Sequence, residues 1–410
     1  MGGPTPNAGG RGPNLYSGPM TSSDPSTTAG RIRVGVAGLG AVAQAVHLPL
    51  LSRHDDTFEI AALADLAPSL LERIGDRYGV AERGRAGSVD ELLELPGLDA
   101  IILLTSGSHG APALAALDRG LAILCEKPLA TTVAEADRLA ASPAADRLLL
   151  GYMKAYDPAV EEARRIARES AAELLELRAI DVTILHPTSD AQLEFAHLIR
   201  PGGADPKRLV VPGPDRDALV TAALGPAAAE IAPLYEGLLL ASVVHELSVI
   251  RAVTGDRGPL SIDHVDVWPE GEWPPSVLVV GRQASGVRVT IAWHFLDHYP
   301  AYREEVRFHH RGGSVELTFP SPYRLHEPTT LQVETGAAET RRRTMFDSIE
   351  EAFERELLAF GRLVRDGTPA PTGIADGRTD TITCQRIAVA WANRLGIRVG
   401  GEAAEAGAQA

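Results

Sequence analysis

The sequence is poor in cysteine, in positive charge and in long apolar runs. Its 410 residues include two cysteines, Cys125 and Cys384, and no C-x-x-C pair, which argues against a disulfide framework or a structural zinc site and fits a reducing, cytoplasmic compartment. Acidic residues outnumber basic ones by 54 to 39, a net charge of −15, so we expect no nucleic-acid partner bound through its phosphates. No apolar run approaches the roughly 20 residues that cross a bilayer, so we expect no membrane association.

The length and composition are those of a globular protein with more than one domain. Hydrophobic residues make up 45% and charged residues 23% of the chain, values typical of soluble globular proteins. A chain of 410 residues is too long for one compact core and fits two domains with additional tails. Residues 1–30 are rich in Gly, Pro, Ser and Thr and lack the apolar core of a signal peptide, so we predict a disordered extension there.

A strand followed by a glycine-rich turn opens the first predicted domain. Alternating apolar residues at 32–36 lead into a G-x-G-x-x-A sequence at 38–43, and a helical run follows. In this motif the first glycine permits a tight turn, and the second lets the backbone approach a pyrophosphate at the helix N-terminus. A second predicted strand, 58–64, ends at Asp65, about 25 residues after Gly40. This is close to the roughly 20-residue offset at which a carboxylate binds the adenosine ribose, so the pattern predicts a dinucleotide-binding domain.

Further strand and helix units continue this alternation. Residues 98–104 form a continuous apolar run, typical of a parallel strand covered on both faces, and end in a polar turn at 105–109. The next strand, 121–125, leads to Glu126-Lys127-Pro128, and 148–151 is the last strand. Ligands of a doubly wound sheet bind beyond the carboxyl ends of its strands, so the turn and Lys127 are expected beside the cofactor. A solvated loop and a solvated lysine are the alternative interpretations.

Together these motifs resemble the glucose–fructose oxidoreductase and inositol dehydrogenase family (Gfo/Idh/MocA). The resemblance covers about residues 31–396 and is dense in the first half and sparse in the second. It implies an α/β protein with a Rossmann domain at 31–150 and an α+β domain with an open-faced, mostly antiparallel sheet at 151–396. Residues 397–410, rich in Ala and Glu toward their end, are predicted to form a disordered tail. The features that carry the resemblance are VAGLGAVAQAVHLPLL at 36–51, Asp65, Thr105–His109, Glu126-Lys127-Pro128, which is the most specific, and GYMKAY at 151–156.

The resemblance also implies roles for single residues. Lys127 would hydrogen-bond the reacting oxygen, and burial beside a cofactor cation would lower the pKa of its ammonium toward the working pH. A carboxylate at Asp65 repels a 2′-phosphate, so NAD is expected as cofactor, with NADP as the alternative. Gly38, Gly40, Ala41 and Val42 would hold the pyrophosphate, Asp65 the adenosine ribose, and Thr105, Ser106, Gly107, His109 and Glu126 the nicotinamide half, beside Lys127.

The second expected catalytic residue is His245. The family pattern places an aspartate four residues earlier on the same helical face, where this sequence has Ala241. This departure puts the usual proton relay in doubt: either Lys127 and His245 suffice, or another group replaces the aspartate. A satisfied core histidine is the alternative for His245. Candidates for the replacement are Tyr235, Tyr156 and Glu246, and the residues expected at the substrate are Lys154, Tyr156, Tyr235 and His294.

The sequence pattern in the rest of the second half indicates an insertion and a sheet. Residues 186–232 are rich in proline and lack periodicity, so they are interpreted as a substrate lid or as a plain surface insertion. Residues 286–294 alternate as a strand, and 305–309 and 314–319 form a predicted hairpin. An open sheet face suits a homodimer or homotetramer. No metal is expected, because His294, His298, His309 and His310 do not have the spacing of a ligand cluster.

Two amphipathic helices complete the predicted fold. The first covers 348–364, with Ser348 as its N-cap and Ile349, Phe353, Leu357 and Phe360 on its apolar face. The second covers 380–395 and ends at Gly396.

The expected activity is hydride transfer between NAD(P) and a secondary alcohol or ketone of a sugar, a cyclitol or a sugar-like small molecule. Two alternatives stay open. One is a non-catalytic, nucleotide-binding regulatory protein, suggested by Ala241. The other is an enzyme that oxidises its substrate transiently to enable elimination or epimerisation.

Overall fold

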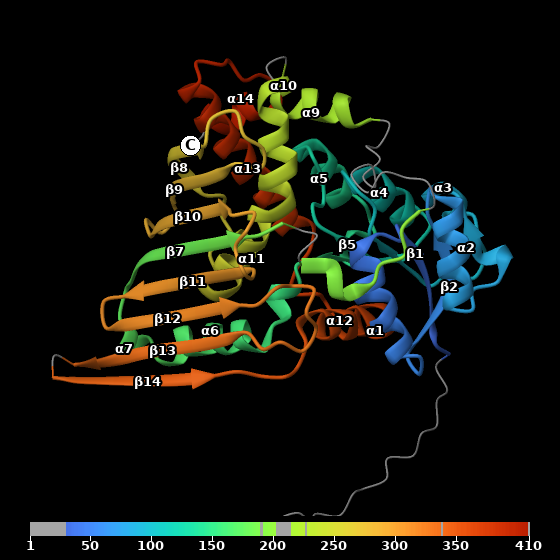
Figure 1. Ribbon diagram of the computed structural model, residues 1–410, viewed down its shortest axis with the longest axis horizontal. Coiled ribbons are helices and arrows are strands. Elements are labelled where there is room, and N and C mark those ends of the chain that lie inside the picture. Colours follow the sequence, from blue (N-terminus) through green and yellow to red (C-terminus); the bar gives the residue numbers. More distant parts are fainter. Residues whose placement is uncertain (1–29, 189–191, 202–214, 226–227, 338, 409–410) are drawn as a thin grey trace, which may run out of the picture. The chain divides into compact units, whose positions relative to one another are not determined.

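The computed structural model describes residues 30–188, 192–201, 215–225, 228–337 and 339–408. The predicted extension at 1–30 lies outside these residues, apart from Gly30. Figure 1 shows two sheets flanked by helices.

The N-terminal sheet has six parallel strands in the order β3-β2-β1-β4-β5-β6, which confirms the doubly wound topology. The strand order reverses between β1 and β4, and ligands bind at such a switch point. Every residue of β4 and β5 is buried, as expected for strands covered on both faces. The strands are β1 (Ile32–Ala37), β2 (Phe58–Ala64), β3 (Arg85–Ala86), β4 (Ala100–Leu103), β5 (Ala122–Glu126) and β6 (Leu148–Gly151).

Short helices connect these strands, and side chains cap two of them. In α5 (Val133–Ala140), Thr132 and Glu135 form a capping box. In α3 (Val89–Leu93), Ser88 accepts a hydrogen bond from the backbone of Glu91 at 3.1 Å, but the Glu91 carboxylate accepts from Gly87 instead of closing the box. The other elements are η1 (Ala43–His47, a π-helical turn), α1 (Leu48–Arg53), α2 (Pro68–Arg77), η2 (Glu82–Gly84), α4 (Gly110–Asp118), η3 (Ala145–Arg147) and η4 (Met153–Tyr156).

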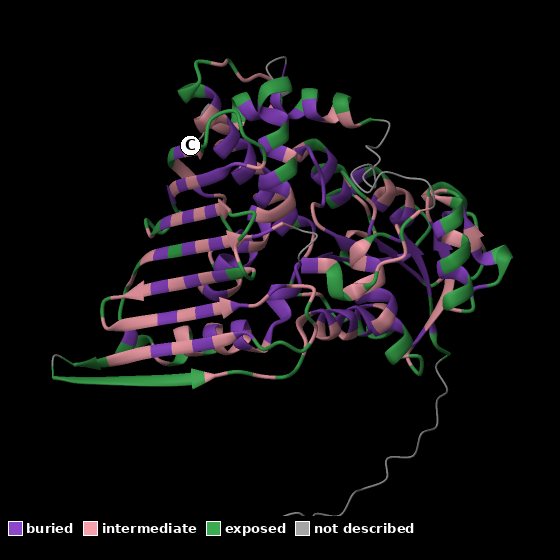
Figure 2. Ribbon diagram, viewed as in Figure 1, coloured by how far each residue is buried: buried purple, intermediate pink, exposed green. Residues whose placement is uncertain are grey.

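The C-terminal sheet has eight strands in the order β14-β13-β12-β11-β7-β10-β9-β8. Only the β7–β10 pair is parallel among the described strands, so the sheet is mostly antiparallel as expected. Buried and less buried residues alternate along β10 and β11, whereas β14 is exposed (Figure 2). The strands are β7 (Leu177–His186), β8 (Ser261–Trp268), β9 (Ser276–Arg282), β10 (Arg288–Phe295), β11 (Arg303–His310), β12 (Gly313–Phe319), β13 (Thr330–Ala337) and β14 (Thr340–Phe346).

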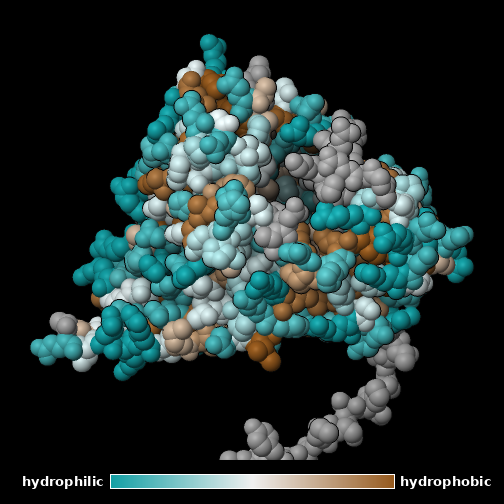
Figure 3. All heavy atoms as spheres, viewed as in Figure 1, coloured by the Kyte–Doolittle hydropathy of each residue, from teal (hydrophilic) through white to brown (hydrophobic). Residues whose placement is uncertain are grey.

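Helices α6 (Pro158–Glu169), α7 (Ala171–Leu174) and α13 (Ile374–Arg394) pack against this sheet. The opposite face of the sheet is turned toward the viewer in Figure 1. The open-faced sheet implied by the resemblance therefore has a clear counterpart. Hydrophilic residues cover most of the surface seen in this view, and hydrophobic residues form small separate patches (Figure 3).

Helix α12 (Ala352–Asp366) joins the two halves of the chain. Its side chains Phe353, Leu357 and Phe360 are buried in one core with residues of the N-terminal sheet. The predicted start at Ser348 was wrong, because Glu351 is the N-cap and accepts from the backbone of Glu354 at 2.9 Å. Ile349, expected on the apolar face, is 78% exposed.

One continuous helix carries the second half of the candidate site. It consists of α10 (Ala228–Leu234), the π-helical η7 (Tyr235–Val243) and α11 (Val244–Thr254). Among the described residues, its segment Ala229–Thr254 is the one helix long and apolar enough to cross a membrane, so the expectation that no stretch approaches that length was wrong. Of its apolar window 67% is buried inside the fold, as in the core helix of a globular protein.

The C-terminal tail is folded, contrary to the prediction for 397–410. Residues Gly401–Ala408 form α14, in which Ala403 is buried. The Glu402 carboxylate accepts from the backbone N–H groups of Val133 and Ala134, at 2.7 and 2.9 Å, at the start of α5. An acidic side chain is stabilising at a helix N-terminus, and this contact holds the tail in place.

The predicted insertion at 186–232 contains η5 (Glu194–Ala196), α9 (Arg216–Leu224) and α10 in its described parts. These described parts therefore contain helices of their own.

Candidate active site

The two glycines of the G-x-G-x-x-A turn have different surroundings. Gly38 has a φ of +89°, and a Cβ there would lie 2.6 Å from the carbonyl oxygen of Leu104. Only glycine fits this position, because the backbone conformation and the close approach both exclude a side chain. A Cβ on Gly40 would meet nothing within 4 Å. Gly40 therefore borders open space at the start of the helix, which suits an approaching pyrophosphate.

These surroundings predict opposite defects for two substitutions. Gly40→Val should leave the midpoint of thermal unfolding close to that of the wild type but abolish NADH binding, because the new side chain fills the space at the turn. Gly38→Ala should instead destabilise the fold through its clash with Leu104. Calorimetry and NADH fluorescence titration measure the two properties. A Gly40→Val protein that binds NADH with wild-type affinity would remove this turn from the cofactor site.

Asp65 lies directly after β2 and faces the same turn. Its Oδ2 accepts from the backbone N–H of Leu39, and its Oδ1 accepts from that of Ala67, both at 2.8 Å. The carboxylate is thereby fixed beside the glycine turn. Each carboxylate oxygen has a further lone pair, so both can still accept from a ribose hydroxyl.

The turn at 105–109 is tied to the segment that carries Lys127. His109 is buried, its Nδ1–H donates to the carbonyl of Pro128 at 2.7 Å, and its backbone N–H donates to that of Leu129. Burial lowers the pKa of His109. His109 thus ties the turn to the segment that carries Lys127. A Cβ on Gly107 would meet nothing within 4 Å.

Glu126, the last residue of β5, is also held in place. Its Oε1 lies 3.4 Å from Nε2 of His47, and its Oε2 accepts from the backbone N–H of Lys127 at 3.2 Å. Burial acts to raise the pKa of Glu126, but its interactions with His47 and Lys127 outweigh that effect and lower it. The buried carboxylate of Glu126, the residue before Lys127, therefore helps to hold Lys127 in position.

Lys127 reaches from the N-terminal sheet to the long helix of the C-terminal half. Its Nζ donates to the backbone carbonyl of Ala241 at 2.6 Å. Ala241 lies in the π-helical segment η7, and such segments occur frequently at functional sites. The ammonium therefore meets the chain at the position where the family pattern has an aspartate. Burial lowers the pKa of Lys127, while Glu126 and Glu246 partly offset this.

His245 lies about one helical turn beyond Ala241. Burial, followed by the positive charges of Lys127 and Lys154, lowers the pKa of its imidazole well below the usual value. The ring packs edge-on against Tyr152, with 6.5 Å between ring centroids. Its buried Nδ1 has no hydrogen-bond partner among the described residues. A neutral imidazole with an unused nitrogen can accept a proton, and Lys127 is near enough to influence its charge.

A buried ion cluster lies behind His245. Lys154 is 5% exposed, and its Nζ contacts Oε1 of Glu246 at 3.4 Å and Oε2 of Glu304. The hydroxyl of Tyr302 donates to Glu304 at 2.6 Å. Burial would lower the pKa of Lys154, but the two carboxylates raise it overall. Burial, followed by Glu304, raises the pKa of Glu246 to about 8. These contacts place Lys154 in the cluster rather than on an open substrate surface.

The other predicted substrate residues have separate partners. The hydroxyl of Tyr156 bonds to Oγ1 of Thr372 at 2.9 Å, and that of Tyr235 donates to the carbonyl of Thr131 at 2.7 Å. Both tyrosines are buried, so these contacts assign them to the packing of the fold. His294 is partly exposed and lies edge-on to Trp268 at 5.8 Å.

Three aromatic residues near the long helix were not predicted as site residues. The ring of His186 lies 5.0 Å from that of Trp293 and 5.6 Å from that of Tyr302. Trp293 Nε1 donates to the hydroxyl of Ser242, the residue after Ala241, at 3.0 Å. The period-two pattern places Trp293 on the buried face of its strand, but no local signal joins residues this far apart in sequence.

Glu356 of α12 is buried near Glu126, and neither of its carboxylate oxygens has a hydrogen-bond partner among the described residues. Burial, followed by the charges of Glu126 and Glu351, raises its pKa well above the usual value. A raised pKa in the folded state means that ionisation opposes folding. The penalty is absent below the pKa of the unfolded chain, and it grows by about 1.4 kcal/mol for each pH unit as the pH rises from there toward the pKa of the folded state.

Glu356→Gln should therefore gain stability relative to the wild type as pH rises. Urea unfolding from pH 4 to 9 measures the difference, which should be smallest at pH 4. Parallel stability curves for the two proteins would contradict the assignment of a neutral Glu356.

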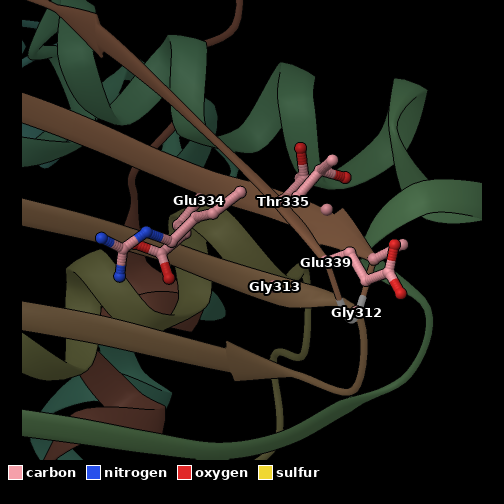
Figure 4. Close-up of a pocket in the computed structure, with 9 residues that line it drawn as sticks. Gly312, Gly313, Glu334, Thr335 and Glu339 are labelled. Atoms are coloured by element: carbon pink, nitrogen blue, oxygen red, sulfur yellow. The ribbon is translucent and has the colours of Figure 1, made fainter.

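A surface cavity of about 460 Å³ lies elsewhere, at the hairpin end of the C-terminal sheet (Figure 4). Within the described part of the chain, no group of three or more His, Cys, Asp or Glu side chains is placed to hold a metal ion. None of the residues that line the cavity has a predicted site role. They are Gly312, Gly313, Glu334, Thr335, Gly336, Ala337, Glu339, Thr340 and Arg341.

Comparison with known proteins identifies the N-terminal part. Residues 32–152 match the family described as "Oxidoreductase family, NAD-binding Rossmann fold" (GFO_IDH_MocA). This part of the chain matches the Gfo/Idh/MocA oxidoreductase family. The turn at 38–43, Asp65 and Lys127 all fall within the matched Gfo/Idh/MocA region, which is an NAD-binding Rossmann domain.

Curated relatives of the Gfo/Idh/MocA region include inositol dehydrogenases. Inositol 2-dehydrogenase 3 of Saccharopolyspora erythraea is 34% identical over 143 residues, which cover 33% of this chain and 40% of the relative. Inositol 2-dehydrogenase/D-chiro-inositol 3-dehydrogenase of Shouchella clausii is 31% identical over 155 residues, which cover 36% and 44%. The chain thus spans less than half the length of these relatives.

Solved structures resemble the whole fold. A 3-ketoreductase from Actinomadura kijaniata, in complex with TDP-benzene and NADP, has a TM-score of 0.64 at 19% identity, over 90% of this chain and 98% of that one. An aldose-aldose oxidoreductase from Caulobacter crescentus, complexed with glycerol, has a TM-score of 0.62 at 19% identity, over 90% and 99%. At these identities the likeness establishes the two-sheet fold alone.

Proposed function

We propose that the protein transfers hydride between NAD(P) and a secondary alcohol or ketone of a sugar, a cyclitol or a sugar-like small molecule. One observation carries the proposal: Lys127, directly after β5 of the Rossmann sheet, donates to Ala241 in the helix that also carries His245. Two groups suited to a reacting hydroxyl thereby come from distant parts of the chain to one place. Relatives named as inositol dehydrogenases support cyclitols or sugars as the substrate class.

The residues present fit a nicotinamide dinucleotide. Open space at Gly40 suits the pyrophosphate, the fixed carboxylate of Asp65 suits the adenosine ribose, and open space at Gly107 suits the nicotinamide half. The cofactor, when bound, would accept or supply the hydride. Asp65 favours NAD over NADP, because its negative charge repels a 2′-phosphate.

In the proposed reaction Lys127 holds the substrate oxygen and His245 handles its proton. The ammonium of Lys127 donates to the oxygen and stabilises the negative charge that develops when hydride leaves the carbon. The neutral imidazole of His245 accepts the hydroxyl proton, and returns it when a ketone is reduced. The carbonyl of Ala241 can orient Lys127 but cannot exchange a proton, so His245 must do alone what an aspartate and a histidine share in the family pattern.

Ala241 also supports a second candidate function, a nucleotide-binding regulatory protein that has lost catalysis. The Nδ1 of His245, which has no hydrogen-bond partner among the described residues, favours the enzyme, because it can take a proton from a substrate hydroxyl.

The absorbance of reduced nicotinamide tests these possibilities. The purified protein is mixed with NAD and with a panel of cyclitols, aldoses and other polyols. Net formation of NADH supports the dehydrogenase. A tightly retained cofactor with chemical change in the substrate but no net NADH supports transient oxidation during elimination or epimerisation. Binding of NADH without any change in substrate or cofactor across the panel supports the regulatory protein.

The site of action and assembly are part of the same proposal. We expect the protein to act in the cytoplasm, as a homodimer or homotetramer joined through the open face of the C-terminal sheet.

A further inference from the structure

We propose that the insertion contributes to the cofactor site, as a strap across the adenosine half of the dinucleotide crevice. The strap is defined as residues 192–201. This inference rests on the dinucleotide binding of the proposed function but concerns a segment that neither the sequence motifs nor the family match includes.

The first anchor of the strap is Gln44, which lies four residues after Gly40. The Nε2 of Gln44 donates to the carbonyl of Leu39 in the glycine turn at 2.8 Å and to the carbonyl of Ile199 at 3.0 Å. Its Oε1 accepts from the backbone N–H of Ile199 at 2.8 Å. One amide side chain therefore pairs both backbone groups of a strap residue and binds the turn at the same time.

The second anchor is Arg73 of α2, the helix that follows Asp65. Its Nη1 donates to the carbonyl of Arg200 at 3.4 Å. Ile199 also packs, partly buried, against the hydrophobic core of the N-terminal sheet. Consecutive strap residues thus contact the helical segment after β1 and the helix after β2. These two strands are neighbours in the sheet, and Asp65 lies between the two anchors in the chain.

This placement has a consequence for the cofactor. The crevice between the ends of β1 and β2 is where an adenosine ribose and its phosphates lie in a Rossmann fold. A strap fastened on both sides of that crevice covers the adenosine half, while the nicotinamide half lies toward Lys127. Arg73 also places a positive side chain at this edge of an otherwise acidic protein, which favours an anionic ligand. Release of the dinucleotide then requires the strap to detach.

Hydrogen exchange of the wild-type protein tests the placement without a substitution. ADP and NADH should each slow the exchange of backbone amides in residues 192–201, whereas nicotinamide mononucleotide should leave them unchanged, because it lacks the adenosine half. Equal exchange in the presence and absence of ADP and NADH, under conditions where both bind, would overturn the proposal.

Rates of NADH release test the anchor itself. Gln44→Met keeps the size of the side chain and removes its hydrogen bonds, so NADH should dissociate about tenfold faster, as expected for the loss of neutral hydrogen bonds. Ile199→Pro removes the N–H from which Gln44 accepts, together with the apolar side chain that packs against the core, and should act in the same direction. The matched control is Gln192→Met. Gln192 lies in the strap, but its Oε1 accepts from the hydroxyl of Ser321 in the C-terminal half, at 3.3 Å. Loss of this hydrogen bond should leave the rate of NADH release unchanged.

Failure of the strap proposal can be distinguished from failure of the proposed function. If the wild type binds NADH but Gln44→Met and Ile199→Pro release it at the wild-type rate, the strap is overturned and the proposed function stands. If the wild type binds neither NADH, NADPH nor ADP, the proposed function is overturned and the strap with it.

Discussion

Lys127→Ala should lower kcat by about 10²–10⁴-fold and leave the dissociation constant of NADH nearly unchanged. The structure fixes the ammonium between β5 and the helix of His245, through its bond to Ala241. Its removal deprives the developing negative charge on the substrate oxygen of its donor. Turnover with an active polyol from the panel measures the first quantity, and NADH fluorescence titration measures the second.

The double variant Lys127→Ala/His245→Ala provides the control. If both groups act on one oxygen, the double variant should lose little more activity than either single variant, because groups that act as a unit are not additive. Independent losses that multiply would show that the two side chains serve different steps. A Lys127→Ala enzyme with wild-type kcat would contradict the role of Lys127 outright.

Lys154→Met should destabilise the protein by about 3–5 kcal/mol, the cost of breaking a buried ion pair by removing one partner. The methionine fills the space of the lysine stem but leaves the carboxyl groups of Glu246 and Glu304 buried together without a cation. The free energy of unfolding in urea at pH 7 measures the loss. A variant as stable as the wild type would contradict the buried cluster.

The triple variant Lys154→Met/Glu246→Gln/Glu304→Gln separates charge from packing. It removes the unpaired charges and should recover most of the lost stability. Its activity then decides the part played by Glu246, which directly follows His245. Recovery of wild-type kcat would assign the cluster to folding alone. A stable but slow enzyme with an altered pH profile would assign Glu246 to the positioning of His245 and to the work of the missing aspartate.

The N-terminal sheet could be predicted because its signals are local. The turn at 38–43, the carboxylate at Asp65 and the Thr132–Glu135 capping box each lie within a few residues of the element that they determine. Strand ends were predicted to within one or two residues where Gly or a polar turn follows, as at β4 and β5. The topology then follows from the right-handed alternation of strand and helix.

The errors arose where distant residues decide the outcome. Ser348 and Glu351 both resemble helix caps, and the choice depends on which register buries Phe353 and Leu357 against the N-terminal core. The tail is ordered because Glu402 reaches the start of α5, a contact without any local signal.

The candidate site likewise combines local sequence signals with contacts between residues that are distant in the chain. Lys127, Asp65 and His245 belong to motifs that are visible in the sequence, whereas the partners of Lys154 at Glu246 and Glu304 lie far along the chain. The bond between Gln44 and Ile199 likewise joins a motif to an aperiodic insertion.

A crystal structure of the complex with NAD⁺ would test the central claim most directly. We expect the pyrophosphate at Gly40 beneath the strap and the nicotinamide ring beside the Thr105–Gly107 turn, with its reactive carbon facing a space bordered by Lys127 and His245. A nicotinamide ring bound away from that space, with Lys127 and His245 on opposite sides of intervening protein, would contradict it.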